Sequence, residues 1–155
     1  MGSIIRKVLG RFGSQIQKPE NWAVCTIWSD GRQVGTAIVR KDFQFRRRDY
    51  PWLVLVELPI SGNVRTDEED GIFNAIEEEL SLIEQAGSMK LLASVGQSPT
   101  RMWILYAKTE SVVANAVYEV VSSFGCTVQE FFDPKWERYA ELGVCSHQHR
   151  PRPYC

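Results

Sequence analysis

The segment from Thr66 to Gly87 constrains the fold most, because its pattern is typical of one amphipathic helix. Thr66 and Glu69 form a capping box, in which each side chain bonds the backbone amide of the other residue. Gly87 supplies a stop at the other end. Apolar residues recur along one face: Ile72, Phe73, Ile76, Leu80 and Ile83. A helix with one apolar face must pack against another layer, which the rest of the chain has to supply.

Six segments around this helix have a strand-like composition, rich in β-branched and aromatic residues. They are residues 22–28, 34–39, 52–58, 89–95, 102–108 and 127–132. The first two are joined by Asp30-Gly31, a strong hairpin signal, and the fourth and fifth by a turn at Gln97–Thr100. A valine-rich helix ended by Gly125 is predicted over 110–124, and a short helix over 135–142.

The resulting order of elements, β-β-β-α-β-β-α-β, predicts the α+β class. Its last six elements follow the β-α-β-β-α-β order of the split-βαβ, or ferredoxin-like, arrangement. Right-handed crossovers would place both helices on one face of an antiparallel sheet. We expect one domain at residues 21–142, preceded by an N-terminal helix and linker at 1–20 and followed by a flexible tail at 143–155.

Size and composition agree with one globular domain. The chain has 155 residues, 44% hydrophobic and 24% charged, which is enough apolar material for a core without a disulfide or a metal. An amphipathic pattern at residues 3–12 lacks the unbroken apolar run and cleavage site of a secretory signal. It is predicted to pack on the domain, with a partner-binding or membrane-surface anchor as the alternative. We therefore expect a cytoplasmic protein.

Cysteine and histidine usage gives little support for a metal site. Cys25 and Cys126 lie in apolar stretches and are predicted to be buried, reduced thiols. One ligand-like cluster lies in the tail: Cys145, His147, His149 and Cys155. Its spacing matches no standard zinc pattern, so we expect no metal and no cofactor. Zinc binding by the tail stays open as the alternative.

A recognisable catalytic set is also missing. The chain has two histidines, both in the tail, and no nucleophile elbow, phosphate loop or glycine-rich dinucleotide turn. Eight acids lie between residues 67 and 84. They are expected along the solvent side of one helix rather than facing each other across a cleft, as paired catalytic carboxylates must. We therefore predict that the protein is not an enzyme.

The charges are divided unevenly between the two halves of the chain. Residues 1–65 carry eleven Lys/Arg and five Asp/Glu, whereas residues 66–155 carry seven and fourteen. The acid-rich helix is a candidate docking surface for a basic protein, because charge complementarity sets specificity and association rate. The candidate partner-binding residues are Asp70, Asn74, Glu77, Glu78, Ser81 and Glu84. A solvated helix face without a partner is the alternative.

Nucleic acid is a less favoured partner. Arg46-Arg47-Arg48, flanked by Phe43, Phe45 and Tyr50, combines cations for phosphates with aromatic rings for bases. However, the aromatic central-strand motif of RNA-recognition modules is missing, and the sequence pI is about 6.1. We interpret this segment as a charged loop between strands.

Several short motifs occur in an order that is typical of one bacterial family. They are Glu68-Glu69, Leu82-Ile83-Glu84, Val95-Gly96, Trp103-Ile104-Leu105-Tyr106 and the closing D-x-x-W-x-x-Y of Asp133, Trp136 and Tyr139. From about Asn21 to Leu142 the chain resembles the domain-of-unknown-function family numbered 695. The resemblance implies a bacterial, cytoplasmic and non-catalytic protein. Small domains of this kind are similar to immunity proteins encoded beside secreted toxins, including those of type VI secretion.

The closing motif also has a structural interpretation. Asp133 is a suitable helix N-cap with Pro134 at the first helical position. Trp136 and Tyr139 share a helix face and would pin the terminal helix to the sheet. For the whole chain we expect an immunity-type inhibitor that neutralises a cognate toxin with a basic surface, such as a nuclease. The alternatives are a regulator of a cytoplasmic ribonuclease or other enzyme and, less favoured, an RNA-binding module.

Overall fold

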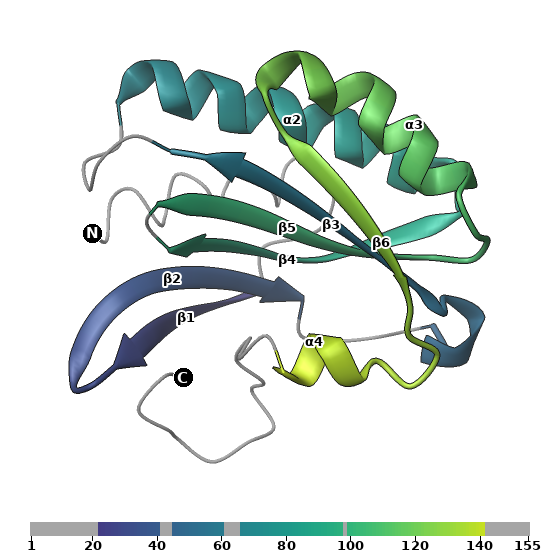
Figure 1. Ribbon diagram of the computed structural model, residues 1–155, viewed down its shortest axis with the longest axis horizontal. Coiled ribbons are helices and arrows are strands. Elements are labelled where there is room, and N and C mark those ends of the chain that lie inside the picture. The colour runs from purple at the N-terminus through teal and green to yellow at the C-terminus, as the bar shows by residue number, and fades with distance from the viewer. Residues whose placement is uncertain (1–21, 41–44, 61–65, 98, 142–155) are drawn as a thin grey trace.

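The computed structural model describes residues 22–40, 45–60, 66–97 and 99–141. Figure 1 shows a twisted sheet with helices α2 and α3 on one side and the short helix α4 on the other. The strands are β1 (Trp22–Ser29), β2 (Arg32–Arg40), β3 (Trp52–Pro59), β4 (Met89–Gln97), β5 (Thr100–Ala107) and β6 (Thr127–Phe132). The helices are α2 (Asp67–Gln85), α3 (Val112–Val121) and α4 (Glu137–Glu141), with 3₁₀ turns at Arg47–Asp49 and Ser122–Phe124. The predicted α+β class is confirmed.

The six strands form one antiparallel sheet in the order β1-β2-β4-β5-β3-β6. β3 pairs with β5 and β6, and β5 also pairs with β4. The β1–β2 hairpin joins this group through Gly35–Val39 of β2, which pair with β4. At Gly35 the two strands lie so close that a Cβ atom would collide with the carbonyl oxygen of Gly96. A glycine is therefore needed where the hairpin crosses onto β4.

The local signals in the sequence mark the ends of several elements correctly. Asp30 and Gly31 both have positive φ, 53° and 75°, as a type I′ hairpin turn requires. Thr66 accepts a hydrogen bond from the Glu69 amide at 3.1 Å, and the Glu69 carboxylate accepts one from the Thr66 amide at 3.2 Å. Gly87 follows α2 with a φ of 91°. Turn chemistry and capping therefore set these boundaries.

The sheet buries one apolar cluster on each face. The helix-side cluster contains residues of α2 and α3 with strand residues beneath them, among them Phe73, Leu80, Val117, Val54, Leu91 and Trp103. The α4-side cluster takes the alternate positions of the same strands, among them Leu53, Leu55, Ile104 and Tyr106, and adds Trp136. Successive side chains of a strand point to opposite faces, and here both faces are buried. β3 and β5 are therefore apolar at nearly every position.

Two helix boundaries differ from the prediction. α3 occupies Val112–Val121 rather than 110–124, because Ser111 has a positive φ of 66° and the last turn tightens to a 3₁₀ turn before Gly125. α4 begins at Glu137 rather than at residue 135, because Trp136 also has a positive φ, 58°.

Some predictions fall outside the described residues. These are the helix at residues 3–12, the tail from residue 143 and the possible metal cluster within that tail. In the part of the chain that the structure describes, no helix is long and apolar enough to cross a membrane.

Candidate functional site

The predicted partner-binding stripe of α2 turns mostly toward the sheet. Its members are Asp70, Asn74, Glu77, Glu78, Ser81 and Glu84. Glu77 and Ser81 are buried, with 3% and 4% of their surface exposed, and the Glu84 side chain is 9% exposed. Of the six, only Glu78 is exposed, while Asp70 and Asn74 are half-buried. The expectation of a solvent-facing stripe is therefore wrong for Glu77, Ser81 and Glu84.

Glu84 is held in an ion pair where β2 ends. Arg40, the last residue of β2, is 5% exposed, and its Nη2 lies 2.9 and 3.0 Å from the two carboxylate oxygens of Glu84. Arg40 Nε donates to the Leu91 carbonyl at 3.0 Å, and the Leu91 amide donates to Glu84 Oε1 at 2.6 Å. The pairing of β2 with β4 stops at Val39 and Ala93, so these two side chains satisfy backbone groups just beyond that point. The pair therefore joins α2, β2 and β4.

Glu77 also faces strand residues rather than solvent. Its carboxylate accepts a hydrogen bond from the indole Nε1 of buried Trp103 at 3.3 Å. Buried Arg101 places its guanidinium 4.9 Å from the ring centroid of Phe73 and 5.8 Å from that of Trp103. A carboxylate that leaves water needs hydrogen bonds or an opposite charge, and β5 supplies donors beneath the helix. The number of acids in α2 therefore overstates the charge on its surface.

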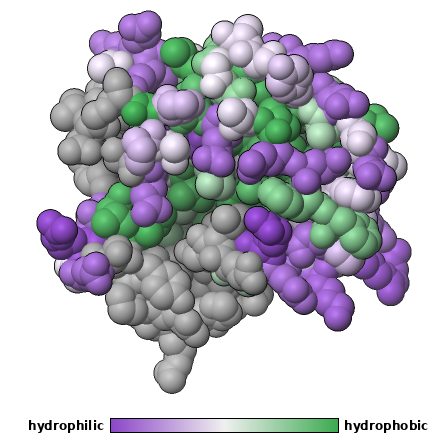
Figure 2. Space-filling model, viewed as in Figure 1, coloured by the Kyte–Doolittle hydropathy of each residue, from purple (hydrophilic) through white to green (hydrophobic). Residues whose placement is uncertain are grey.

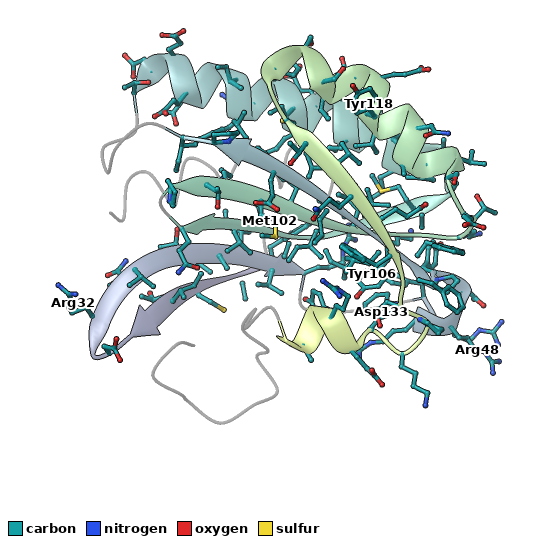
Figure 3. All side chains as sticks on the ribbon, in the orientation of Figure 1. Arg32, Arg48, Met102, Tyr106, Tyr118 and Asp133 are labelled. Carbon is teal, nitrogen blue, oxygen red and sulfur yellow. The ribbon has the colours of Figure 1, made fainter. Side chains whose placement is uncertain are left out.

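The outward surface of α2 and α3, here called the outer helical surface, is nevertheless acidic. Its exposed residues include Glu68, Glu78, Leu82, Gln85, Val112, Asn115, Tyr118 and Glu119. Neither helix contains a lysine or an arginine. Leu82 is 61% exposed and Tyr118 is 56% exposed. Figure 2 shows hydrophilic side chains over both ends of this layer, and Figure 3 places Tyr118 on the outer side of α3.

On the opposite face, Trp136 holds the segment before α4 against the sheet. Its ring stacks on Tyr106, with the centroids 4.1 Å apart and the planes 19° from parallel. Tyr139 meets both rings edge-on, at 6.2 Å from Tyr106 and 5.7 Å from Trp136. The Trp136 indole donates to the Tyr50 carbonyl at 3.0 Å. The predicted packing role of Trp136 and Tyr139 is confirmed.

Asp133 joins this aromatic cluster to α4. Its carboxylate accepts a hydrogen bond from the Tyr106 hydroxyl at 2.7 Å and from the amides of Glu137 and Arg138 at 2.9 and 3.0 Å. Asp133 therefore accepts from the first two amides of α4, as a capping side chain does, but it lies four residues before the helix rather than at the predicted N-cap position. The prediction that Pro134 is the first helical residue is wrong, because two turn residues and Trp136 separate the cap from Glu137. The buried carboxylate thus serves structure.

Burial disfavours the ionised form of several cysteine and tyrosine side chains. Desolvation raises the pKa of Tyr106 and Tyr139 well above the usual range of a phenol, and for Tyr106 the hydrogen bond to Asp133 raises it further. Burial raises the pKa of the Cys25 and Cys126 thiols to about 11. Since the thiolate is the nucleophile, neither cysteine is prepared for covalent chemistry at neutral pH. Cys126 is buried as predicted, whereas Cys25 is only half-buried.

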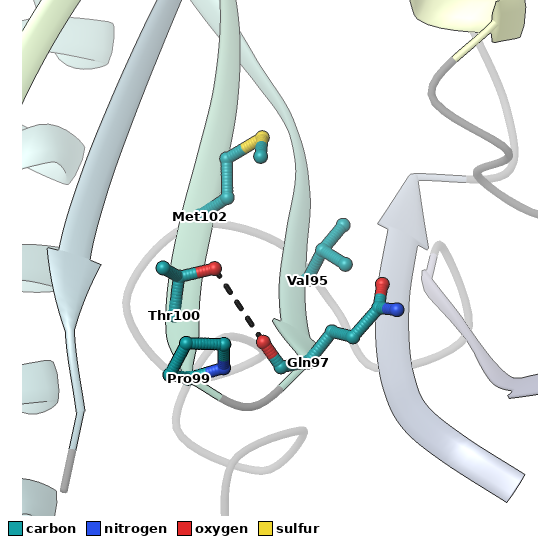
Figure 4. A pocket seen from close by; sticks show the side chains of 5 residues that line it. All are labelled: Val95, Gln97, Pro99, Thr100 and Met102. Atoms are coloured by element: carbon teal, nitrogen blue, oxygen red, sulfur yellow. Dashed lines mark hydrogen bonds between the residues drawn. The ribbon is translucent and has the colours of Figure 1, made fainter.

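A shallow hollow of about 230 Å³ lies at the tip of the β4–β5 hairpin (Figure 4). It is lined by Val95, Gln97, Pro99, Thr100 and Met102. None of these side chains is ionisable, so the hollow offers no general acid or base. Within the described ranges, no group of three or more His, Cys, Asp or Glu residues is placed to hold a metal ion.

No protein-family model, no curated protein and no solved structure matches this chain. The resemblance to the family numbered 695 therefore stays a prediction from its motifs.

Sequence reasoning missed the buried arginines. The second predicted strand stops at residue 39, just before Arg40, whereas Arg40 ends β2 and is buried against α2. A signal was present in the helix: Glu77 and Glu84 are seven residues apart, so they lie on one flank of α2, beside the apolar face. Carboxylates on that flank need cationic or donor side chains on the facing strands.

Proposed function

We propose that this chain is a non-catalytic protein-binding domain whose binding site is the outer helical surface. One observation carries the proposal: two helices without any lysine or arginine expose Leu82 and Tyr118 among carboxylates. Large exposed apolar side chains bordered by polar ones are typical of protein interaction sites, and tyrosine is common among the residues that dominate binding energy. The carboxylates would attract and orient a basic partner.

The binding residues of this proposal differ in part from the stripe that the sequence predicts. We assign the contacts to Glu78, Leu82, Tyr118 and Glu119, which are all exposed. Asp70 and Asn74 would form the half-buried border of the site. The remaining three predicted residues, Glu77, Ser81 and Glu84, are buried between α2 and the sheet. We propose that they affect binding only by holding α2 in place.

The chemistry of this surface suits an immunity-type inhibitor in the bacterial cytoplasm. Enzymes that act on nucleic acid carry basic clefts, because their substrate is a polyanion. An acidic surface with two apolar side chains would occupy such a cleft and exclude the substrate. We propose a secreted toxin such as a nuclease as the partner. A cytoplasmic ribonuclease or other enzyme under regulation is the alternative, and it would use the same surface.

We also propose that β3, α2, β4, β5, α3 and β6 form a ferredoxin-like core, with the β1–β2 hairpin as an addition. The support is the order β4-β5-β3-β6, in which α2 and α3 each connect strands that are not neighbours. Both helices also pack into one cluster. The hairpin then widens the sheet without covering the helical layer. An experimental structure with the two helices on opposite faces would contradict this proposal.

The experiment captures the native partner with paired variants. Tagged wild-type protein, a Glu78→Lys/Tyr118→Ala variant and a Glu137→Lys control are incubated with a native cell extract, and retained proteins are identified by mass spectrometry. Glu137 is exposed on α4, on the other side of the sheet, so its reversal tests for unspecific charge effects. We expect one protein on the wild type and the control that is lost with the double variant.

The captured protein is then purified and titrated against each variant. We expect the double variant to bind at least about a hundredfold more weakly, the size typical of losing two central contacts. Co-expression of the wild type should also restore growth to cells poisoned by the partner. Equal affinity of the double variant and the wild type would remove the outer helical surface from consideration.

A further inference from the structure

A row of apolar side chains crosses four strands on the α4-side face of the sheet. Its members are direct partners across the sheet, Cys25 with Ala37, Ala37 with Val95, and Val95 with Met102. Ile27 lies two residues further along β1 and therefore points to the same face. We call these five residues the apolar row. All except Ala37 are only half-buried, although they pack against the α4-side cluster. The row therefore keeps apolar surface that a further segment could cover.

The row opens into the hollow at the tip of the β4–β5 hairpin (Figure 4). Val95 and Met102 belong to both. Beside them, Ile27 pairs with Gly35 and Gly35 pairs with Gln97. Since Gly35 has no side chain, the surface is low between these two neighbours. The hollow of about 230 Å³ is smaller than the roughly 300–1,000 Å³ of pockets that bury a small molecule. Aliphatic side chains of a protein segment suit it better.

α4 leads the chain toward the apolar row. The helix ends at Glu141, and Tyr139 in its last turn meets the Tyr106 ring edge-on. Burial raises the pKa of the Tyr139 phenol, and the nearby Cys25 thiol raises it further, so α4 lies close to β1. Figure 1 shows the later, yellow end of α4 directed toward the β1–β2 hairpin. The residues that follow α4 therefore start beside the row.

These next residues have the length and the pattern that the row requires. Tyr106, which lies beneath Tyr139, and Met102 are four residues apart on β5, a distance of roughly 13 Å. An extended chain covers this distance in about four residues. The four residues after Glu141 are Leu142-Gly143-Val144-Cys145. Alternate residues of an extended chain point to one side, so both aliphatic side chains can face the sheet. The following eight residues are only Ser, His, Gln, Arg and Pro.

We propose that Leu142 and Val144 pack on the apolar row, so that residues 142–145 complete the cover of the α4-side face. A foreign peptide or a second copy of the chain would lose translational and rotational freedom on binding there. A segment that is already tethered to α4 loses much less, and it is present at a high effective concentration. The predicted flexible tail would then begin at about residue 146 rather than at 143.

Chemical cross-linking tests the proposal on the unmodified full chain. Cys25 lies in the row and Cys145 ends the proposed segment. Dilute protein is treated with a short bifunctional maleimide, and the linked peptides are identified by mass spectrometry. We expect a link between Cys25 and Cys145 within one chain, in preference to a link between Cys25 and Cys155. A mixture of isotope-labelled and unlabelled protein distinguishes links within one chain from links between chains.

The rate at which a maleimide labels Cys25 provides a second measurement. It is made in a Cys145→Ser/Cys155→Ser background, so that no tail thiol competes. Leu142→Glu/Val144→Glu should raise the rate at least about tenfold, the equivalent of losing one buried aliphatic side chain. The matched control is Ser146→Glu/Gln148→Glu, which adds the same charge just beyond the segment and should leave the rate unchanged. Circular dichroism confirms that each variant is folded, and Leu142→Ser/Val144→Ser replaces the glutamate variant if that one does not fold.

Three results would overturn the proposal. The first is the lack of any Cys25–Cys145 link, and the second is a Cys25 rate that the substitutions at 142 and 144 leave unchanged. The third is a link that forms only between chains, which would assign the apolar row to a second copy. None of these results affects the outer helical surface, because it lies on the other side of the sheet and shares no residue with the row.

Discussion

The two faces of the central sheet are filled in different ways. On one face, α2 and α3 lay long apolar stripes on the strands, and the flank of α2 adds carboxylates that meet Arg40 and Trp103. On the other face, a helix of five residues that contains Tyr139 follows a segment held by Trp136 and Asp133. The first face distributes its stabilising contacts over many side chains, whereas the second concentrates them in a few. Single substitutions should therefore cost more on the second face.

The largest effect is expected from Trp136→Ala. Trp136 is 2% exposed and stacks on Tyr106 while it donates to the Tyr50 carbonyl. Truncating a buried tryptophan should lower the free energy of unfolding by about 4 kcal/mol. Urea denaturation followed by circular dichroism measures this change. Phe132→Ala, at a largely exposed ring, is the control and should cost less than about 1 kcal/mol; similar losses in both would contradict the concentration of contacts around Trp136.

Breaking the ion pair of the helix-covered face should have the next largest effect. Arg40→Met leaves the Glu84 carboxylate without its cation in a site that is largely closed to water. We expect a loss of about 3 kcal/mol, because an uncompensated buried charge is costly. The double variant Arg40→Met/Glu84→Leu should recover most of this loss. If the double variant is no more stable than Arg40→Met, shape rather than charge decides the site.

Tyr106→Phe removes only the hydroxyl that donates to Asp133. A hydrogen bond to a carboxylate contributes about 2 kcal/mol, and the ring packing stays intact. Urea denaturation should show a loss of this size. Tyr118→Phe is the matched control on the outer helical surface, since Tyr118 is exposed, and it should leave stability unchanged. An equal loss in both variants would show that the Asp133 contact contributes nothing of its own.

Thr66→Ala tests the helix-covered face of the sheet, at the N-terminus of α2. The substitution removes the hydroxyl that accepts from the Glu69 amide. The expected loss is about 1 kcal/mol, since a helix of 19 residues is held mainly by its packing. Thr109→Ala, in an exposed loop, is the control. A loss above that of Tyr106→Phe would mean that the cap, rather than packing, decides whether α2 forms.

The smallest effect is expected from raising the pH from 7 to 9. The thiols of Cys25 and Cys126 ordinarily lose their protons near pH 9.0 but hold them to about pH 11 in the fold. The pKa of Tyr106 and that of Tyr139 are raised above 10.0 by burial. The folded state therefore keeps protons that the unfolded state loses, so stability is complete below pH 9 and falls as the pH rises further.

Urea denaturation at a series of pH values measures this dependence. Cys126→Ala should make the decline between pH 9 and 11 shallower, because it removes one of the groups responsible. A stability that rises over this range would contradict the assigned directions of all four shifts.

The sequence determined the identity and order of the elements. Caps, turns and periodicity act between residues a few positions apart, so Thr66–Glu69, Asp30-Gly31 and Gly87 could be read directly. The runs of β-branched and aromatic residues in β3 and β5 likewise predicted strands. The same local reasoning found the capping carboxylate of α4, Asp133, but placed the first helical residue wrongly, because Trp136 has a positive φ and the helix begins only at Glu137.

Only the tertiary structure decided which flank of α2 faces water. The amphipathic pattern defines an apolar face, but it does not determine whether the residues at the edges of that face are buried. Glu77 and Glu84 lie at such an edge. Their burial depends on Trp103 and Arg40, which are 26 and 44 residues away in the chain. The contact of Trp136 with the Tyr50 carbonyl spans 86 residues. Lys90 and Lys108 likewise approach the same Tyr50 ring only because antiparallel pairing brings the start of β4 beside the end of β5.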